Sequence, residues 1–215
     1  MIAVIDAGIG NVGSVMRWLE RENLECVRVK NASELRDYET LVLCGVSSLN
    51  NCASVLEKKG FTSVICDVAK EPSVRILGIC LGMHLCFAEG SEGGFSKCLN
   101  LLAGDVIPVG ELLPTSTPRT NVGWRTIESV YDGLEEQDAG LRGLADELNL
   151  EKAFFCHSFG VNISSETVLK YRFGTREFSA VQVRNNVMGV QFHPEKSGEV
   201  GTLIANCWLR RRHRL

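Results

Sequence analysis

The 215-residue sequence has few features that would direct it to a membrane or to nucleic acid. No apolar run is long enough to span a bilayer, and the N-terminus lacks the basic flank, apolar core and small-residue cleavage site of a secretory signal. The net charge is -3, and the one basic cluster is the terminal "RRRHR" (Arg210 to Arg214), which we interpret as a solvated tail. We therefore expect no nucleic acid partner, no membrane partner and a cytoplasmic protein.

Paired cysteines are also missing. The nine cysteines are an odd number, and no two of them form a C-x-x-C pair, so zinc ligation is not indicated. In a reducing compartment, most of them are expected to be small buried hydrophobic residues. This expectation covers Cys26, Cys44, Cys66, Cys86 and Cys207. We expect no metal.

The glycines near the N-terminus resemble a dinucleotide-binding fingerprint but lack its acid. The segment "GIGNVG" fits G-x-G-x-x-G between a strand-like and a helix-like run. That fingerprint requires an acidic residue at the end of the next strand, whereas "ECVRVK" ends on Lys30. We therefore expect no cofactor and interpret the segment as a tight strand-to-helix turn with Asn11 as the helix N-cap.

Apolar strand-like runs alternate with helical spacing in the first half of the chain. The runs are "MIAVID", "ECVRVK", "TLVLCG" and "VRILGIC". Alternating strands and helices predict a parallel sheet covered on both faces. From about Gly104 the runs shorten, which favours antiparallel or mixed strands added to the same sheet: "DVIPV", "KAFFCHSFGV", "TVLKYRF", "FSAVQV" and "VMGVQF". The prediction is one α/β domain over residues 1–215, with a mixed, mostly parallel central sheet flanked by helices.

Two segments interrupt this pattern. Gly110 to Thr120 is rich in proline and threonine and is expected to be a loop. The segment "GLEEQDAGLRGLADEL", residues 133–148, is polar and is interpreted as a mobile insertion.

The fourth strand runs directly into "GICLGMHLCF", which places Cys80 in a G-x-C-x-G sequence. This has the form of the nucleophile elbow, in which a sharp strand-to-helix turn lifts a side chain above the sheet. A thiol at a helix N-terminus is favoured as the thiolate that attacks carbonyl groups. Cys80 is therefore the candidate nucleophile.

A nucleophilic cysteine needs a base, and only four histidines are present. His213 lies in the basic tail, His84 follows Cys80 by one helical turn, and His157 lies in a strand-like run. His193 is the best candidate because it closes an apolar strand and is followed by Pro194 and Glu195. A His-x-Glu pair can place the carboxylate on one ring nitrogen while the other faces the thiol.

The motifs "GICLGM" and "VQFHPEKS" together resemble the class I glutamine amidotransferases, which have a flavodoxin-like architecture. The segments "IDAGIGN", "LVLCGV" and "VGW" are similar to one branch, the glutaminase subunits of imidazole glycerol phosphate synthase in histidine biosynthesis. The resemblance extends over nearly the whole chain. It implies hydrolysis of glutamine to glutamate and ammonia, and channelling of the ammonia to a synthase partner of (βα)8-barrel type.

The resemblance also implies roles for individual residues. Cys80, His193 and Glu195 would form the triad, and the backbone N–H groups of Leu81 and of the loop at Gly45 and Val46 would hold the oxyanion. The residues implied in substrate binding are Ser47, His84, Glu92, His157, Ser158 and Phe159. Those implied at the partner interface are Gly10, Asn11, Asn121 and Trp124.

Several positions depart from the family pattern. His84 stands where the family usually has Gln, "CGVS" where it has "PGVG", "NVGWR" where it has "HMGWN", and Phe159 where it has Tyr. A paralogous glutaminase subunit that supplies ammonia to a sugar amidotransferase in surface-polysaccharide biosynthesis therefore stays open. A non-catalytic regulatory subunit and a free-standing γ-glutamyl hydrolase are further alternatives, although the intact triad argues against the former.

Overall fold

The fold is described by a computed structural model that covers residues 1–110, 113–114, 118–130 and 139–210. The strands of the main sheet are β1 (Ile2–Ile5), β2 (Cys26–Val29), β3 (Thr40–Gly45), β4 (Arg75–Cys80), β8 (Asn121–Ser129), β9 (Lys152–His157), β11 (Thr167–Phe173), β12 (Arg176–Arg184) and β13 (Val187–Val190). Two small two-stranded sheets pair β5 (Glu89–Gly90) with β6 (Ser96–Lys97), and β7 (Val106–Pro108) with β10 (Phe159–Val161). The helices are α1 (Val12–Arg21), α2 (Leu49–Lys58), α3 (Phe61–Val68), α4 (Leu81–Leu85), α5 (Ala139–Leu148) and α6 (Glu199–Ile204). Shorter turns are η1 (Ala32–Asp37), η2 (Pro194–Lys196) and η3 (Ala205–Leu209).

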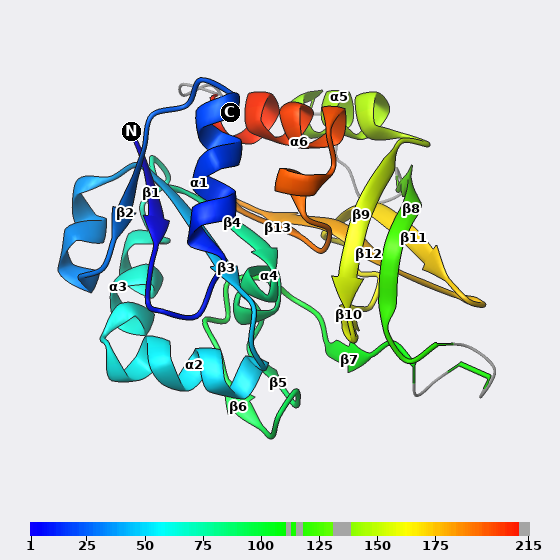
Figure 1. Cartoon of the computed structure of the whole chain (residues 1–215), viewed down its shortest axis with the longest axis horizontal. Coiled ribbons are helices and arrows are strands. Elements are labelled where there is room, and N and C mark those ends of the chain that lie inside the picture. The colour runs from blue at the N-terminus through cyan, green and yellow to red at the C-terminus, as the bar shows by residue number, and fades with distance from the viewer. Residues whose placement is uncertain (111–112, 115–117, 131–138, 211–215) are drawn as a thin grey trace.

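The main sheet has nine strands in the order β2-β1-β3-β4-β13-β12-β11-β8-β9. The first five are parallel to one another, and the pairs from β13 to β9 are antiparallel. Figure 1 shows the parallel strands at one end of the molecule and the antiparallel strands at the other. The predicted mixed α/β sheet is thus confirmed, with the change of direction at β13.

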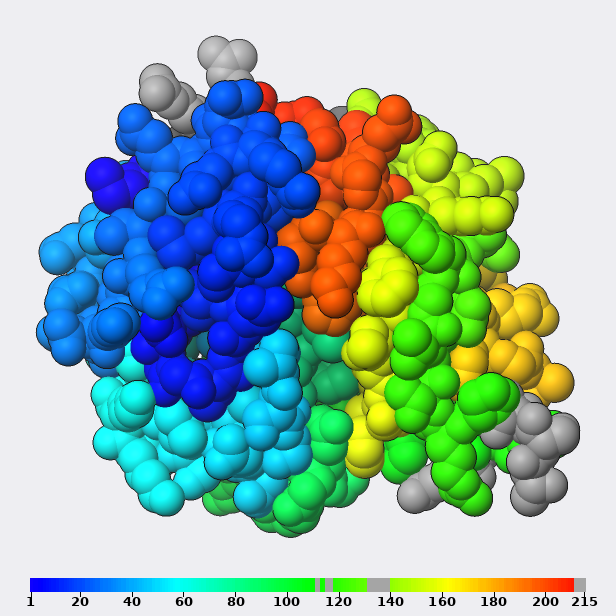
Figure 2. Space-filling view, viewed as in Figure 1, coloured from blue at the N-terminus to red at the C-terminus, as the bar shows by residue number. Residues whose placement is uncertain are grey.

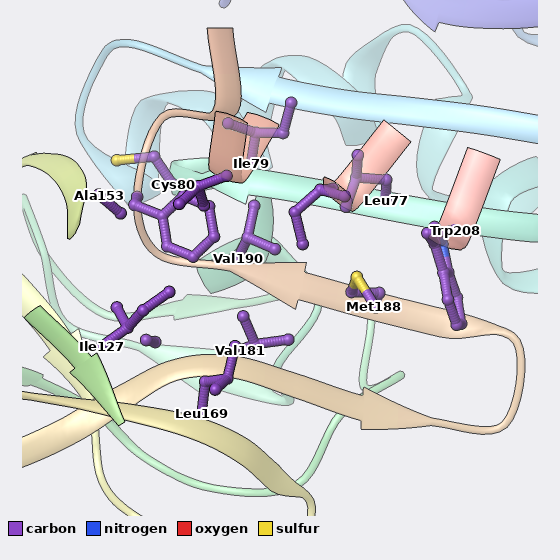
Figure 3. Packing of buried hydrophobic residues seen from close by; sticks show 14 of the residues in the cluster. Leu77, Ile79, Cys80, Ile127, Ala153, Leu169, Val181, Met188, Val190 and Trp208 are labelled. Carbon is purple, nitrogen blue, oxygen red and sulfur yellow. The ribbon is translucent and has the colours of Figure 1, made fainter. Parts of the chain in front are cut away.

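Helices cover both faces of this sheet, as the alternating sequence pattern predicts. One buried cluster joins the sheet to α1, α5 and α6, and its sheet residues include Val42, Ile79 and Val190. The other joins it to α2, α3 and α4. Figure 3 shows side chains of the first cluster, with Leu77 and Ile79 on β4 beside Met188 and Val190 on the neighbouring strand β13. Within the described residues, no helix is long and apolar enough to cross a membrane.

The turn before α1 is built as the sequence predicts. The Asn11 side chain accepts a hydrogen bond from the Ser14 N–H at 3.3 Å and caps the helix. Gly10 is needed for packing, because a Cβ there would lie 2.6 Å from the Cys44 carbonyl oxygen. Gly13 has ordinary space around it, with Arg17 Nη1 at 3.5 Å. The third glycine of the apparent fingerprint is therefore not required by packing.

Two expectations for the second half are wrong. The "DVIPV" run gives β7, which pairs with β10 outside the main sheet. Residues 139–148 form α5 rather than a mobile insertion, and its Leu144, Ala145 and Leu148 are buried against the sheet. Apolar residues three and four positions apart make this helix amphipathic. Residues 133–138 and part of the Gly110 to Thr120 loop lie outside the described residues.

All nine cysteines lie in the described part of the chain, and none of them forms a disulfide bond there. Cys44 and Cys86 are buried as expected, whereas Cys26, Cys66 and Cys207 are only half-buried, so the expectation of buried cysteines is wrong for those three.

Candidate active site

The nucleophile elbow expected from the sequence is present at the β4–α4 junction. Cys80 is the last residue of β4 and has φ 53° and ψ -108°, a conformation that side chains rarely adopt. The flanking glycines make the turn possible, because a Cβ at Gly78 would lie 2.6 Å from the Gly82 carbonyl oxygen and a Cβ at Gly82 would overlap the Leu43 carbonyl oxygen of β3. The Cys80 sulfur points away from the apolar cluster (Figure 3).

The loop after β13 brings a histidine to this sulfur. His193 Nδ1 is 2.9 Å from Glu195 Oε1, and Cys80 is close enough to His193 to shift its pKa. Burial lowers the pKa of His193, but the hydrogen bonds with Cys80 and then Glu195 raise it, and the result is a pKa of about 10. An imidazole with this pKa is suited to keep a proton beside a thiolate. The three residues expected to form a triad thus lie together.

Backbone contacts hold this loop in place. The His193 N–H donates to the Phe154 carbonyl of β9 at 2.9 Å, and Ser197 Oγ donates to the His193 carbonyl at 2.7 Å. Glu195 is almost fully buried, and its Oε2 has no hydrogen-bond partner within the described part of the chain. A buried carboxylate with one oxygen committed to imidazole is well placed to orient the ring.

The loop after β3 lies against the elbow because β3 pairs with β4, with Gly45 opposite Cys80. Leu81 is the first residue of α4, where backbone N–H groups have no acceptor within the helix. The Val46 N–H, the expected second oxyanion donor, instead donates to the Ile9 carbonyl at 2.8 Å. The expected oxyanion hole therefore has its Val46 donor occupied in this conformation.

The remaining predicted substrate residues have different surroundings. The Cys156 carbonyl, next to His157, lies 3.9 Å from the Cys80 sulfur, which places the end of β9 beside the nucleophile. Glu92 Oε2 accepts from the Leu49 N–H at 3.3 Å, and burial raises the pKa of this carboxyl although that hydrogen bond lowers it. Ser47 Oγ accepts from Asn51 Nδ2 at 3.1 Å.

The other two residues of the "HSF" segment differ in exposure. Ser158 Oγ is exposed and 3.3 Å from Thr120 Oγ1, and Phe159 is half-buried in β10. Figure 2 shows a recess on this face, where atoms of the teal segment that contains β4 and α4 lie behind the cyan loop after β3, the yellow end of β9 and the orange segment after β13.

The two other described histidines do not face solvent. His157 Nε2 accepts from Asn121 Nδ2 at 3.0 Å, and its Nδ1 donates to the Phe159 carbonyl at 2.7 Å. Burial lowers the pKa of His157 to about 3, and that of His84 to about 4. His84 Nε2 lies 2.8 Å from Gln191 Oε1. With such low pKa values, neither ring can hold a second proton near pH 7, which leaves His193 as the described histidine suited to accept and return protons.

One of the four residues expected at the partner interface is buried. Asn121 has no exposed surface, so it cannot touch a partner directly, and its side chain instead binds His157 between β8 and β9. Trp124 on the same strand is 52% exposed, and its neighbour Val122 is also exposed. Asn11 is exposed and Gly10 half-buried at the turn before α1. Val122 and Gln191 are the residues of this region that the sequence did not single out.

Comparisons with known proteins agree with this geometry. The family model described as "Glutamine amidotransferase class-I" matches residues 3–209. The subunit HisH of imidazole glycerol phosphate synthase from Geobacillus kaustophilus is 35% identical over 96% of this chain and 94% of its own. The HisH subunit from Methanopyrus kandleri is 33% identical over 93% and 92% of the two chains.

Solved structures agree on the fold. PurLQS from Thermotoga maritima matches with a TM-score of 0.73 at 20% identity, over 97% of this chain and 96% of that one. The glutaminase domain of Trypanosoma brucei CTPS with bound acivicin matches with a TM-score of 0.62 at 15% identity, over 99% and 95% of the two chains. The elbow, the His-Glu pair and a family match over nearly the whole length agree with one another: this chain belongs to the class I glutamine amidotransferases.

Proposed function

We propose that this chain is the glutaminase subunit of an imidazole glycerol phosphate synthase and supplies ammonia for histidine biosynthesis. The observation that carries the proposal is the meeting of Cys80, His193 and Glu195 at the end of the parallel strands, in a chain similar to HisH subunits over nearly its whole length. The HisH relatives, at 33% and 35% identity, favour a role in histidine biosynthesis over ammonia supply to a sugar amidotransferase.

The chemistry follows from the positions of the three side chains. The Cys80 thiolate attacks the side-chain amide carbon of glutamine, and the carbonyl oxygen becomes an oxyanion. His193 gives its proton to the leaving nitrogen, so ammonia departs and a thioester to Cys80 remains. His193 then takes a proton from water, which attacks the thioester and releases glutamate. Throughout the cycle Glu195 accepts a hydrogen bond from His193 Nδ1 and so fixes the orientation of the ring.

The oxyanion requires donors, and one of them is committed elsewhere. The Val46 N–H is bonded to the Ile9 carbonyl, next to the exposed Asn11 turn. A partner that binds this turn can draw the Ile9 carbonyl away and release the N–H toward the oxyanion. Since one missing donor costs roughly 10²- to 10³-fold in rate, this contact would keep the isolated chain nearly silent.

The partner we infer is a synthase subunit of (βα)8-barrel type in a heterodimer, whose assembled activity is that of a lyase. Val46, Val122 and Trp124 are large apolar side chains that are more than half exposed; Val46 follows β3, and the other two lie on β8, next to β9. Such a surface suits a protein partner into which ammonia can pass without meeting bulk water. Nine cysteines without a disulfide bond among the described residues favour the cytoplasm as the compartment.

The test is reconstitution with the synthase subunit from the same source. We expect glutamate release from the pair to rise at least a hundredfold over the isolated chain when the synthase carries its acceptor. Cys80→Ser should abolish glutamate release while ammonia-dependent synthesis by the pair continues, and a diazo-ketone analogue of glutamine should label Cys80. Full activity of the isolated chain, or labelling at another cysteine, would overturn the proposal. Stimulation by a sugar amidotransferase instead would reassign the partner.

A further inference from the structure

Gln191 lies between two residues of the elbow segment. It follows β13 directly, two residues before His193, and is completely buried. Its Oε1 is 2.8 Å from His84 Nε2, and its Nε2 lies 3.9 Å from the Cys80 sulfur. The side chains thus form a continuous buried chain of polar contacts from His84 through Gln191 to the sulfur of Cys80.

The contacts determine which end of the amide faces the sulfur. With the proton of His84 on Nε2, the ring donates to Gln191 Oε1, and the amide NH₂ is left for the sulfur. The other tautomer would bury an N–H at His84 Nδ1, which has no partner among the described residues, and would turn the amide oxygen toward the sulfur. An oxygen lone pair repels a thiolate, so the first arrangement is the one compatible with an ionised Cys80.

The other groups near the sulfur make this donor useful. The Cys156 carbonyl can accept from the thiol but cannot stabilise the thiolate. His193 interacts with Cys80 from the loop after β13, yet it must give up its proton to the leaving nitrogen during the reaction. Tyr171 from β11 is electrostatically coupled to Cys80, and its pKa is well above the usual value chiefly because of burial. Gln191 supplies a neutral N–H that does not change protonation state during the cycle.

We propose that Gln191 is a further catalytic residue that donates a hydrogen bond to the Cys80 thiolate, and that His84 is a positioning residue that fixes the orientation of the Gln191 amide. This inference rests on the proposed role of Cys80 as the nucleophile. In this inference His84 acts on Cys80 through Gln191 and does not contact the substrate.

The experiment measures the pH dependence of Cys80 alkylation by iodoacetamide in the full chain, with the modified residue located by mass spectrometry. Gln191→Met keeps the length of the side chain but removes the amide, and His84→Phe keeps an aromatic ring but removes the donor. His84→Gln retains an N–H that can reach Gln191. Leu85→Met, on the same buried helix, is the packing control.

We expect the alkylation midpoint to rise by about one pH unit or more in Gln191→Met and His84→Phe, because a hydrogen bond to an ionised group is lost. The midpoint should return toward the wild-type value in His84→Gln and stay unchanged in Leu85→Met. Unchanged midpoints in Gln191→Met and His84→Phe would overturn the inference, and so would an equal shift in Leu85→Met. If wild-type Cys80 is not labelled by the glutamine analogue, it is the proposed function that fails.

Discussion

Ser47 offers a direct way to test whether the loop after β3 limits the activity of the isolated chain. Gly45 is the last residue of β3, and the loop that follows it begins with Val46 and Ser47. To turn the Val46 N–H away from Ile9, the neighbouring backbone torsions must change together. A side chain at position 47 restricts those torsions, and a glycine does not.

The size of the effect can be worked out from the cost of the restricted conformation. A residue with a side chain pays about 1–2 kcal/mol to enter the left-handed region, and glycine pays almost nothing. If the active loop conformation uses that region at position 47, Ser47→Gly should raise the basal rate by about five- to thirtyfold. This is well below the roughly 10²- to 10³-fold value of an oxyanion donor, so most of the activation should still require the partner.

The assay is steady-state glutamate release by the purified chain without a synthase. Ser47→Ala is the matched control, because it loses the same hydroxyl contact with Asn51 Nδ2 but keeps the Cβ. We expect a higher basal kcat in Ser47→Gly only. If both variants match the wild type, or if both rise equally, the loop is not limited by the backbone at position 47 and the argument is refuted.

Three further predictions concern the elbow, the buried histidines and the triad. Gly82→Ala should lower the free energy of unfolding by about 2 kcal/mol or more in urea titrations, because its Cβ would overlap a carbonyl of β3; an unchanged midpoint would contradict the packing argument. His84 and His157 have lowered pKa values of about 4 and about 3, so only the unfolded chain binds their protons near pH 5. The stability that these two neutral rings contribute should be complete well above pH 6.5 and fall below it by up to about 2.7 kcal/mol per pH unit near pH 5, and His84→Gln should halve that slope. Glu195→Gln should reduce kcat less than His193→Ala does, since the carboxylate orients the ring whereas the ring moves the proton; equal losses would argue against these separate roles.

The features that could be predicted from the sequence are those set by local chemistry. The elbow at Cys80 depends on two glycines and an adjoining helix, and all of these lie within five residues. The contact between His193 and Glu195 depends on a spacing of two residues in a turn. The alternation of strands and helices in the first half similarly predicted the parallel part of the sheet and its helices on both faces. The catalytic roles of these residues remain predictions.

The features that could not be predicted depend on contacts between distant segments. Asn121 is a polar residue at the start of a strand, and only its packing against His157 shows that it is buried. His84 is one helical turn from Cys80, but its partner is Gln191, more than a hundred residues later. The occupied Val46 N–H likewise depends on Ile9 in the first turn of the chain. No local pattern reports such pairings.

The order of strands has a consequence for how the protein is made. β13 is the last strand of the main sheet along the chain, yet it occupies the fifth of nine places in the sheet, beside β4. During synthesis from the N-terminus, the elbow cysteine is complete long before β13 and the histidine that follows it leave the ribosome. Until then β4 has an unpaired edge and its thiol has no base beside it. A truncated chain that ends before residue 187 would therefore carry an unactivated cysteine and an open sheet edge, which makes it a target for chaperones and proteases rather than an uncontrolled source of ammonia.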